Sequence, residues 1–169
     1  MKYITYRNVQ RKGENMNKSI NTNPLVSTEM LIRKPVNIVF EAFIEPDITT
    51  KFWFTKSSGR LSEGKKVLWE WEMYGFSDEI LVKELETNKR ILIQSSNGTT
   101  VEWSFTSRNN NETMVNITNA GFTGNADEVL NHAIDAMGGY TMVLCGLKAY
   151  LEHGILLNLV ADKAPDFHV

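Results

Sequence analysis

The order of apolar and polar positions predicts a series of strands followed by one long amphipathic helix, Asn125 to Glu152. Asn125 and Glu128 have the spacing of a capping box, and Gly154 can end the helix. Apolar residues recur three or four positions apart along its whole length: Val129, Ala133, Met137, Tyr140, Leu144, Leu147 and Leu151. Because this stripe must be buried against another surface, the preceding strands are expected to cover it.

Alternation of apolar and polar residues predicts the strands of that sheet. The clearest is Val67–Met73, in which Val67, Trp69, Trp71 and Met73 point inward while Glu70 and Glu72 point outward. Short turn-forming segments separate successive strands, which predicts antiparallel neighbours and one apolar face. The other predicted strands are Val26–Ile32, Ile80–Leu85, Arg90–Gln94, Val101–Thr106 and Met114–Asn119.

Two prolines mark short helices after the first strand. Pro35 suits the first turn of a helix whose apolar residues share one face, and Pro46 ends this helix and can begin a second. The three adjacent aromatics Phe52, Trp53 and Phe54 follow. They cannot all share one face, so at least one is expected to point into an interior space.

Two separated motifs resemble the family of homologues of the activator of the 90-kDa heat-shock-protein ATPase, within the START-like (SRPBCC) superfamily. The first is the segment Pro35–Pro46, PVNIVFEAFIEP, followed by Phe52-Trp53. The second is similar to the family's C-terminal helix motif, although Tyr140 replaces its tryptophan. It comprises Gly139-Tyr140, Leu144, Leu147 and Tyr150-Leu151-Glu152. The resemblance spans about residues 25 to 153.

The resemblance implies an α+β helix-grip fold, in which a curved antiparallel sheet wraps around the long C-terminal helix. It also implies a cavity between them that often accepts an apolar small molecule. The candidate ligand-binding residues are Trp53, Trp69, Trp71, Met73, Trp103, Phe105, Met137, Tyr140 and Leu144. The alternative is that these side chains fill the core, and an open cavity of roughly 300 Å³ or more would favour binding.

Three glycines within the predicted helix, and one aspartate in the inward phase just before a predicted strand, are unusual at these positions and need a physical explanation. Gly138 and Gly139 each cost about 1 kcal/mol within a helix, which either close packing or a bend beside Tyr140 could offset. Close packing is the prediction for all three helix glycines, including Gly146. Asp78 is in phase with inward-facing residues; it could face Tyr140, but an edge position is the prediction.

Composition excludes several classes of function. A formal charge of −2 lacks the basic excess of nucleic-acid-binding proteins, and no segment has the roughly 20 apolar residues of a membrane span. The lone Cys145 cannot form an internal disulfide. His132, near Glu128 and Asp135, fits a solvated helix face, and no histidine pair has metal-ligand spacing. We therefore expect a cytoplasmic protein without catalytic residues, metal or cofactor, although the sequence does not settle whether it is an enzyme.

The predicted organisation is an N-terminal extension (1–23), one domain (24–154) and an apolar C-terminal tail (155–169) that packs on the domain or on a second copy of the chain. The first functional hypothesis is noncatalytic binding of a small lipophilic or aromatic molecule between sheet and helix. The second, which rests on the resemblance, is a cochaperone-like domain acting on a heat-shock ATPase. The third is a cyclase or hydrolase of a hydrophobic substrate that uses Tyr140 and an interior carboxylate.

Overall fold

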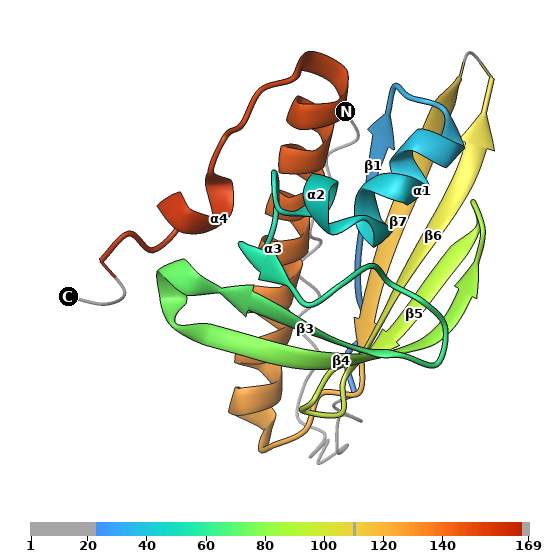
Figure 1. Cartoon of the computed structure of the whole chain (residues 1–169). Helices are drawn as coiled ribbons and strands as arrows, with labels where there is room; N and C mark the ends of the chain where they lie inside the picture. Colours follow the sequence, from blue (N-terminus) through green and yellow to red (C-terminus); the bar gives the residue numbers. More distant parts are fainter. Residues whose placement is uncertain (1–22, 110, 167–169) are drawn as a thin grey trace, which may run out of the picture.

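A curved sheet of antiparallel strands encloses the long helix α3 in the computed structural model, which describes residues 23–109 and 111–166 (Figure 1). The strand order is β1-β7-β6-β5-β4-β3-β2. The α+β helix-grip fold is thereby confirmed, whereas the predicted extension lies outside the described residues except for Asn23. The elements are β1 (Val26–Ile32), α1 (Val36–Ile44), α2 (Pro46–Thr49), β2 (Lys56–Ser57), β3 (Lys66–Trp71), η1 (Glu72–Tyr74), β4 (Phe76–Glu86), β5 (Arg90–Gln94), β6 (Thr100–Arg108), β7 (Glu112–Ala120), α3 (Ala126–His153) and α4 (Leu159–Asp162).

One predicted strand is shorter in the structure. β3 ends at Trp71, and Met73 lies in the following 3-10 turn η1 instead of pointing inward from a strand. Gly75 ends this turn with a left-handed backbone (φ 58°), a conformation that glycine adopts without a steric penalty. The chain thereby reverses into β4, so the inward position predicted for Met73 is wrong.

The core lies between the inward face of the sheet and two helices. Phe40 and Phe43 of α1 pack edge-on against Phe105 of β6, with ring centroids 5.3 and 5.7 Å apart. Leu144 and Leu147 of α3 are fully buried in the same cluster. Phe105 therefore packs against α1 within the core cluster that also contains these leucines of α3.

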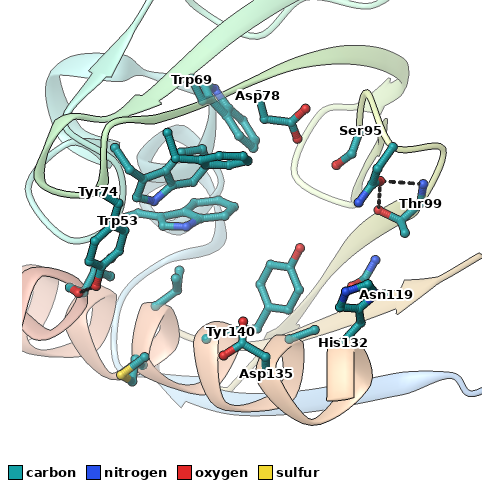
Figure 2. A pocket seen from close by; sticks show the side chains of 18 of the residues that line it. Trp53, Trp69, Tyr74, Asp78, Ser95, Thr99, Asn119, His132, Asp135 and Tyr140 are labelled. Atoms are coloured by element: carbon teal, nitrogen blue, oxygen red, sulfur yellow. Dashed lines mark hydrogen bonds between the residues drawn. The ribbon is translucent and has the colours of Figure 1, made fainter. Parts of the chain in front are cut away.

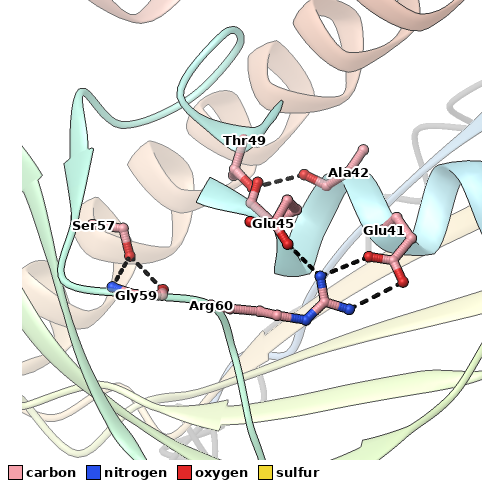
Figure 3. Close-up of polar contacts among 7 residues, drawn as sticks. All are labelled: Glu41, Ala42, Glu45, Thr49, Ser57, Gly59 and Arg60. Carbon is pink, nitrogen blue, oxygen red and sulfur yellow. Dashed lines mark hydrogen bonds and ion pairs between the residues drawn. The ribbon is translucent and has the colours of Figure 1, made fainter. Parts of the chain in front are cut away.

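Polar contacts fix the segment that carries the three adjacent aromatics (Figure 3). The Thr49 hydroxyl donates to the Ala42 carbonyl at 2.7 Å, which ties α2 to α1. In the loop after β2, the Arg60 guanidinium donates to both carboxylate oxygens of Glu41, at 2.8 and 3.0 Å, and also pairs with Glu45. These contacts hold the chain on both sides of Phe52–Phe54.

Both ends of α3 have the predicted caps. The Asn125 side chain accepts hydrogen bonds from the Asp127 and Glu128 amides, each at 3.1 Å, and the Glu128 carboxylate accepts from the Asn125 amide at 2.8 Å. Gly154 ends the helix with φ 68°. The capping box and the glycine stop are therefore confirmed, and α3 begins and ends within one residue of its predicted bounds.

The helix glycines differ in their surroundings. A Cβ atom at Gly146 would lie 3.1 Å from the Phe52 carbonyl oxygen and 3.2 Å from the Phe52 Cβ, so close packing explains this glycine. A Cβ at Gly138 or Gly139 would meet no atom within 4 Å outside the helix backbone. The packing explanation is therefore wrong for this pair, which lies in open space.

Glu152 attaches the C-terminal end of α3 to the first strand. Its side chain is only 7% exposed, and it accepts hydrogen bonds from the Arg33 amide at 2.7 Å and from Lys148 at 2.6 Å. Lys148 also donates to the Leu31 carbonyl at 2.7 Å. Burial alone would raise the pKa of Glu152, but the hydrogen bonds from Arg33 and Lys148 lower it overall.

We expect Glu152→Gln to lower the free energy of unfolding by about 1–2 kcal/mol at pH 7, because hydrogen bonds to a charged acceptor are weakened. The native pKa of Glu152 lies below its ordinary value of 4.5. Its charge therefore stabilises the fold above that pH, and this contribution is lost as the pH falls through the native pKa. Urea titrations from pH 7 to pH 3 should show the difference between the variants shrinking. Glu29→Gln, at an exposed position of β1, is the control and should change stability little.

Candidate functional site

A pocket of about 470 Å³ lies between α3 and the β3–β5 side of the sheet (Figure 2). Helix α3 forms its floor through Gly139, Tyr140 and Val143, and the sheet side supplies aromatic and polar side chains. The C-terminal segment supplies Val160 and Lys163. The remaining lining residues are Trp53, Trp69, Trp71, Tyr74, Phe76, Asp78, Ile93, Ser95, Asn97, Thr99, Asn119, Phe122, Thr123, His132, Asp135, Ala136 and Met142.

Three tryptophans form an apolar wall at one end of this pocket. The Trp53 ring lies 5.0 Å from that of Trp69 and 6.4 Å from that of Trp71, and it meets the Tyr140 ring edge-on at 6.1 Å. Phe76, an exposed side chain, extends the wall with its ring 5.6 Å from that of Trp71. This wall offers flat surfaces to which an aromatic ring can pack.

Polar side chains line the rest of the pocket. The Asp78 carboxylate accepts a hydrogen bond from the Ser96 amide at 3.0 Å, and no residue in the described ranges forms an ion pair with it. Asn119 is only 4% exposed, and its amide nitrogen donates to the Thr100 carbonyl at 2.8 Å. The Thr99 hydroxyl donates to Asn97 at 2.8 Å. Figure 2 shows Thr99 and Asn119 opposite the tryptophans, whereas Asp78 lies beside Trp69, with which it pairs across β3 and β4.

Tyr140 projects from α3 between the two ends, and its hydroxyl points toward the Asp78 side of the pocket (Figure 2). Burial raises the pKa of Tyr140 well above its ordinary value of 10, and the negative charge of Asp78 raises it further. The hydroxyl therefore stays neutral at physiological pH. It can donate or accept a hydrogen bond, but it cannot act as a base there.

The segment after α3 closes one side of the pocket. The Tyr74 hydroxyl donates to the Val160 carbonyl in α4, and Lys163 pairs with Asp135 of α3 at 2.8 Å. These contacts hold the middle of the predicted apolar tail on the domain. Ile155, Leu156 and Leu157, which connect α3 to α4, remain exposed. That a second copy covers these three residues stays a prediction.

Four of the nine candidate residues line the pocket: Trp53, Trp69, Trp71 and Tyr140. Trp103, Phe105 and Leu144 are buried in the core. Met73 lines a separate cavity of about 150 Å³, and Met137 is exposed and lines neither space. Three of the nine thus fill the core, as the alternative reading had it, while the tryptophans around Trp53 border an open space.

Apart from Tyr140, the polar residues that line the pocket are not among the nine candidates from the sequence. Asp78 lies near the start of β4, where it pairs with Trp69 of β3 but not with β5, whose pairing begins at Leu81; this edge position, which the sequence predicted, also lines the pocket. Asn119 had a readable signal, because it is in phase with the inward residues Val115 and Ile117 of β7. Thr99 and Ser95 lie at the turn between β5 and β6, where alternation does not apply. His132 is exposed, and it lines the pocket.

Across residues 23–109 and 111–166, no group of three or more histidine, cysteine or acidic side chains is arranged to hold a metal ion. Cys145 is a free thiol. Within these same ranges, no helix is both long enough and apolar enough to cross a membrane.

Residues 33–152 match the family described as "Activator of Hsp90 ATPase homolog 1-like protein". The chain belongs to this family. The match covers most of the domain, including α1, the whole sheet from β2 to β7 and nearly all of α3. No protein of curated function matches the chain.

Solved structures similar to this family member share its fold. The protein SSP2350 from Staphylococcus saprophyticus is 27% identical, with a TM-score of 0.69, over 79% of this chain and 96% of that one. The Aha1 dimer from Colwellia psychrerythraea is 20% identical, with a TM-score of 0.68, over 78% and 98%. CalU16 from Micromonospora echinospora is 14% identical, with a TM-score of 0.61, over 87% and 98%.

Proposed function

We propose that this protein binds a small aromatic or lipophilic molecule, without catalysis, in the pocket between the sheet and α3. The observation that carries the proposal is a space of about 470 Å³ bordered by Trp53, Trp69 and Trp71. Its volume falls in the range of small-molecule sites, which are mostly apolar with a few placed polar groups. Asp78, Asn119 and Tyr140 are such groups.

Substitutions at Gly139 and Gly138 provide a test of binding in the pocket and its matched control. Gly139 lines the pocket, whereas Gly138 is exposed and does not, and neither has an atom near the position of a Cβ. We expect Gly139→Leu to weaken binding of an aromatic ligand at least about tenfold, because the new side chain occupies the binding space. Gly138→Leu should bind as the unmodified protein does.

Native mass spectrometry and thermal-shift screening against aromatic and apolar metabolites would identify ligands, and calorimetry on the two variants would locate them. Equal weakening by both substitutions would indicate a general effect on α3 and contradict binding in this pocket. Failure of every compound to bind would overturn the proposal.

A second candidate function, cochaperone-like activation of a heat-shock ATPase, is supported by membership of the family. It predicts that the protein co-purifies with an Hsp90 and raises its ATPase rate. Gly139→Leu should leave both properties unchanged, because a pocket occupied by a side chain does not alter the outer surface. Absence of both association and stimulation would remove this candidate.

A further inference from the structure

The pocket has a chemical polarity that narrows the class of ligand, an inference that rests on the proposed function. At the buried polar end, the Thr99 hydroxyl donates to Asn97, and one N–H of the Asn119 side-chain amide donates to the Thr100 carbonyl. Since the Asn119 nitrogen must face that carbonyl, its oxygen faces the other way, and no described residue donates to it. The Asn119 side chain therefore offers a ligand both an acceptor oxygen and its second N–H.

Asp78 adds a negative charge to the polar groups that line the pocket. Its carboxylate has one hydrogen bond, from the Ser96 amide at 3.0 Å, and among the described residues it has no ion-pair partner. The cation of the pocket lining, Lys163, is already paired with Asp135 at 2.8 Å. A ligand carboxylate placed beside Asp78 would therefore face a like charge, which costs free energy.

Two groups of this end can adapt to a ligand. The hydroxyls of Tyr140 and Ser95 can donate or accept, so either can complete the hydrogen bonds of a bound polar group. Asn97 and His132 also carry donors, but both are exposed and compete with water. Among these polar groups, the Asp78 carboxylate can only accept hydrogen bonds, and the Asn119 oxygen is a second acceptor.

The apolar end has a complementary preference. The faces of indole rings attract cations as well as other rings, and Trp53 and Trp71 are only partly buried, so a ligand can reach them. An aromatic ring packed against these tryptophans would hold a short polar substituent near Asp78 and Tyr140, because Asp78 pairs with Trp69 across β3 and β4 and the Tyr140 ring meets that of Trp53.

We propose that the pocket selects aromatic molecules that carry a hydrogen-bond-donating group, with a protonated amine preferred to a hydroxyl, and that it rejects aromatic carboxylates. Recognition has two parts: the tryptophans hold the ring, and Asp78 together with the side-chain oxygen of Asn119 accepts the hydrogens of the substituent.

Four probes with one ring system test this selectivity by calorimetry at pH 7 and low salt: 1-naphthylmethylamine, 2-naphthol, naphthalene and 2-naphthoate. We expect the amine to bind at least about tenfold more tightly than the naphthoate, with the naphthol between them. In Asp78→Asn, which can still accept from the Ser96 amide, the preference for the amine should fall to within about threefold.

Glu79→Gln is the matched control, since Glu79 is the next residue of β4, is exposed, and pairs with Lys66. It removes the same charge and should leave the preference intact. Naphthoate binding as tightly as the amine would overturn the proposed ligand class while supporting a binding pocket. Failure of all four probes to bind would overturn the class and count against the binding function as well.

Discussion

Replacing Trp103 with alanine is expected to lower the free energy of unfolding by about 3–5 kcal/mol, the range for removing a large aromatic from a core. Trp103 is 1% exposed in β6, between its cross-strand neighbours Ile91 and Ile117. Its ring also contacts those of Phe43 and Trp53, with centroids 6.0 and 5.8 Å apart. Chemical denaturation followed by far-UV circular dichroism measures the loss without relying on tryptophan fluorescence.

Trp103→Phe provides a sharper comparison. The indole nitrogen of Trp103 is buried and has no hydrogen-bond partner among the described residues. An unpaired buried donor costs about 1–3 kcal/mol, so removing it offsets part of the volume lost. We expect the phenylalanine variant to lose about 1–2 kcal/mol, less than the alanine variant loses. Equal losses in the two variants would contradict this account.

Trp103→Phe also distinguishes residues that stabilise the core from residues that bind a ligand in the pocket. The sequence predicts that Trp103 contacts a ligand, but Trp103 of β6 does not line the pocket, whereas Trp69 of β3 does. Trp103→Phe should therefore leave ligand affinity unchanged despite its effect on stability. This distinction could not be made from the strand pattern, because alternation assigns both tryptophans to the same inward face.

The sequence predicted the fold well where periodicity and end signals agree. The capping box at Asn125 and the stop at Gly154 bounded α3, and Pro35 and Pro46 marked the two short helices. The end of β3 was misjudged because the apolar phase continues to Met73, although the following Gly75 permits the left-handed turn. The alternation of apolar and polar residues does not predict where the backbone reverses direction.

The candidate site was predictable in its aromatic half only. Trp53, Trp69 and Trp71 follow from inward positions and from the crowding of three adjacent aromatics. The polar half depends on which strands lie side by side: Asp78 comes near Ser96 because β4 pairs with β5, and Asn119 lies beside Thr100 because β7 pairs with β6. Those distances arise from the sheet order and its curvature, which local spacing does not determine.

Gly146→Val is expected to lower the free energy of unfolding by about 2–3 kcal/mol, at the upper end of the usual cost of overpacking. The first added carbon would already lie 3.1 Å from the Phe52 carbonyl oxygen, and valine adds two methyl groups beyond it. Phe52 has little freedom to move away. Its amide donates to Thr49 at 3.2 Å, and its buried ring packs against Phe43 at 5.8 Å.

Gly138→Val makes the same chemical change in the same helix, at an exposed position where no atom lies within 4 Å of the new Cβ. Valine has a slightly higher helix propensity than glycine, so this control should stabilise the protein by about 0.3 kcal/mol. Urea denaturation of both variants measures the contrast directly. If the two variants lost similar free energy of unfolding, the close approach of α3 to Phe52 would not explain Gly146. The explanation would then be that α3 needs flexible residues at both positions. If Gly146→Val destabilises the protein and Gly138→Val stabilises it, packing explains Gly146, and the structure does not require glycine at Gly138. The reason is that, of these two positions, only Gly146 lies close enough to another backbone to exclude a side chain.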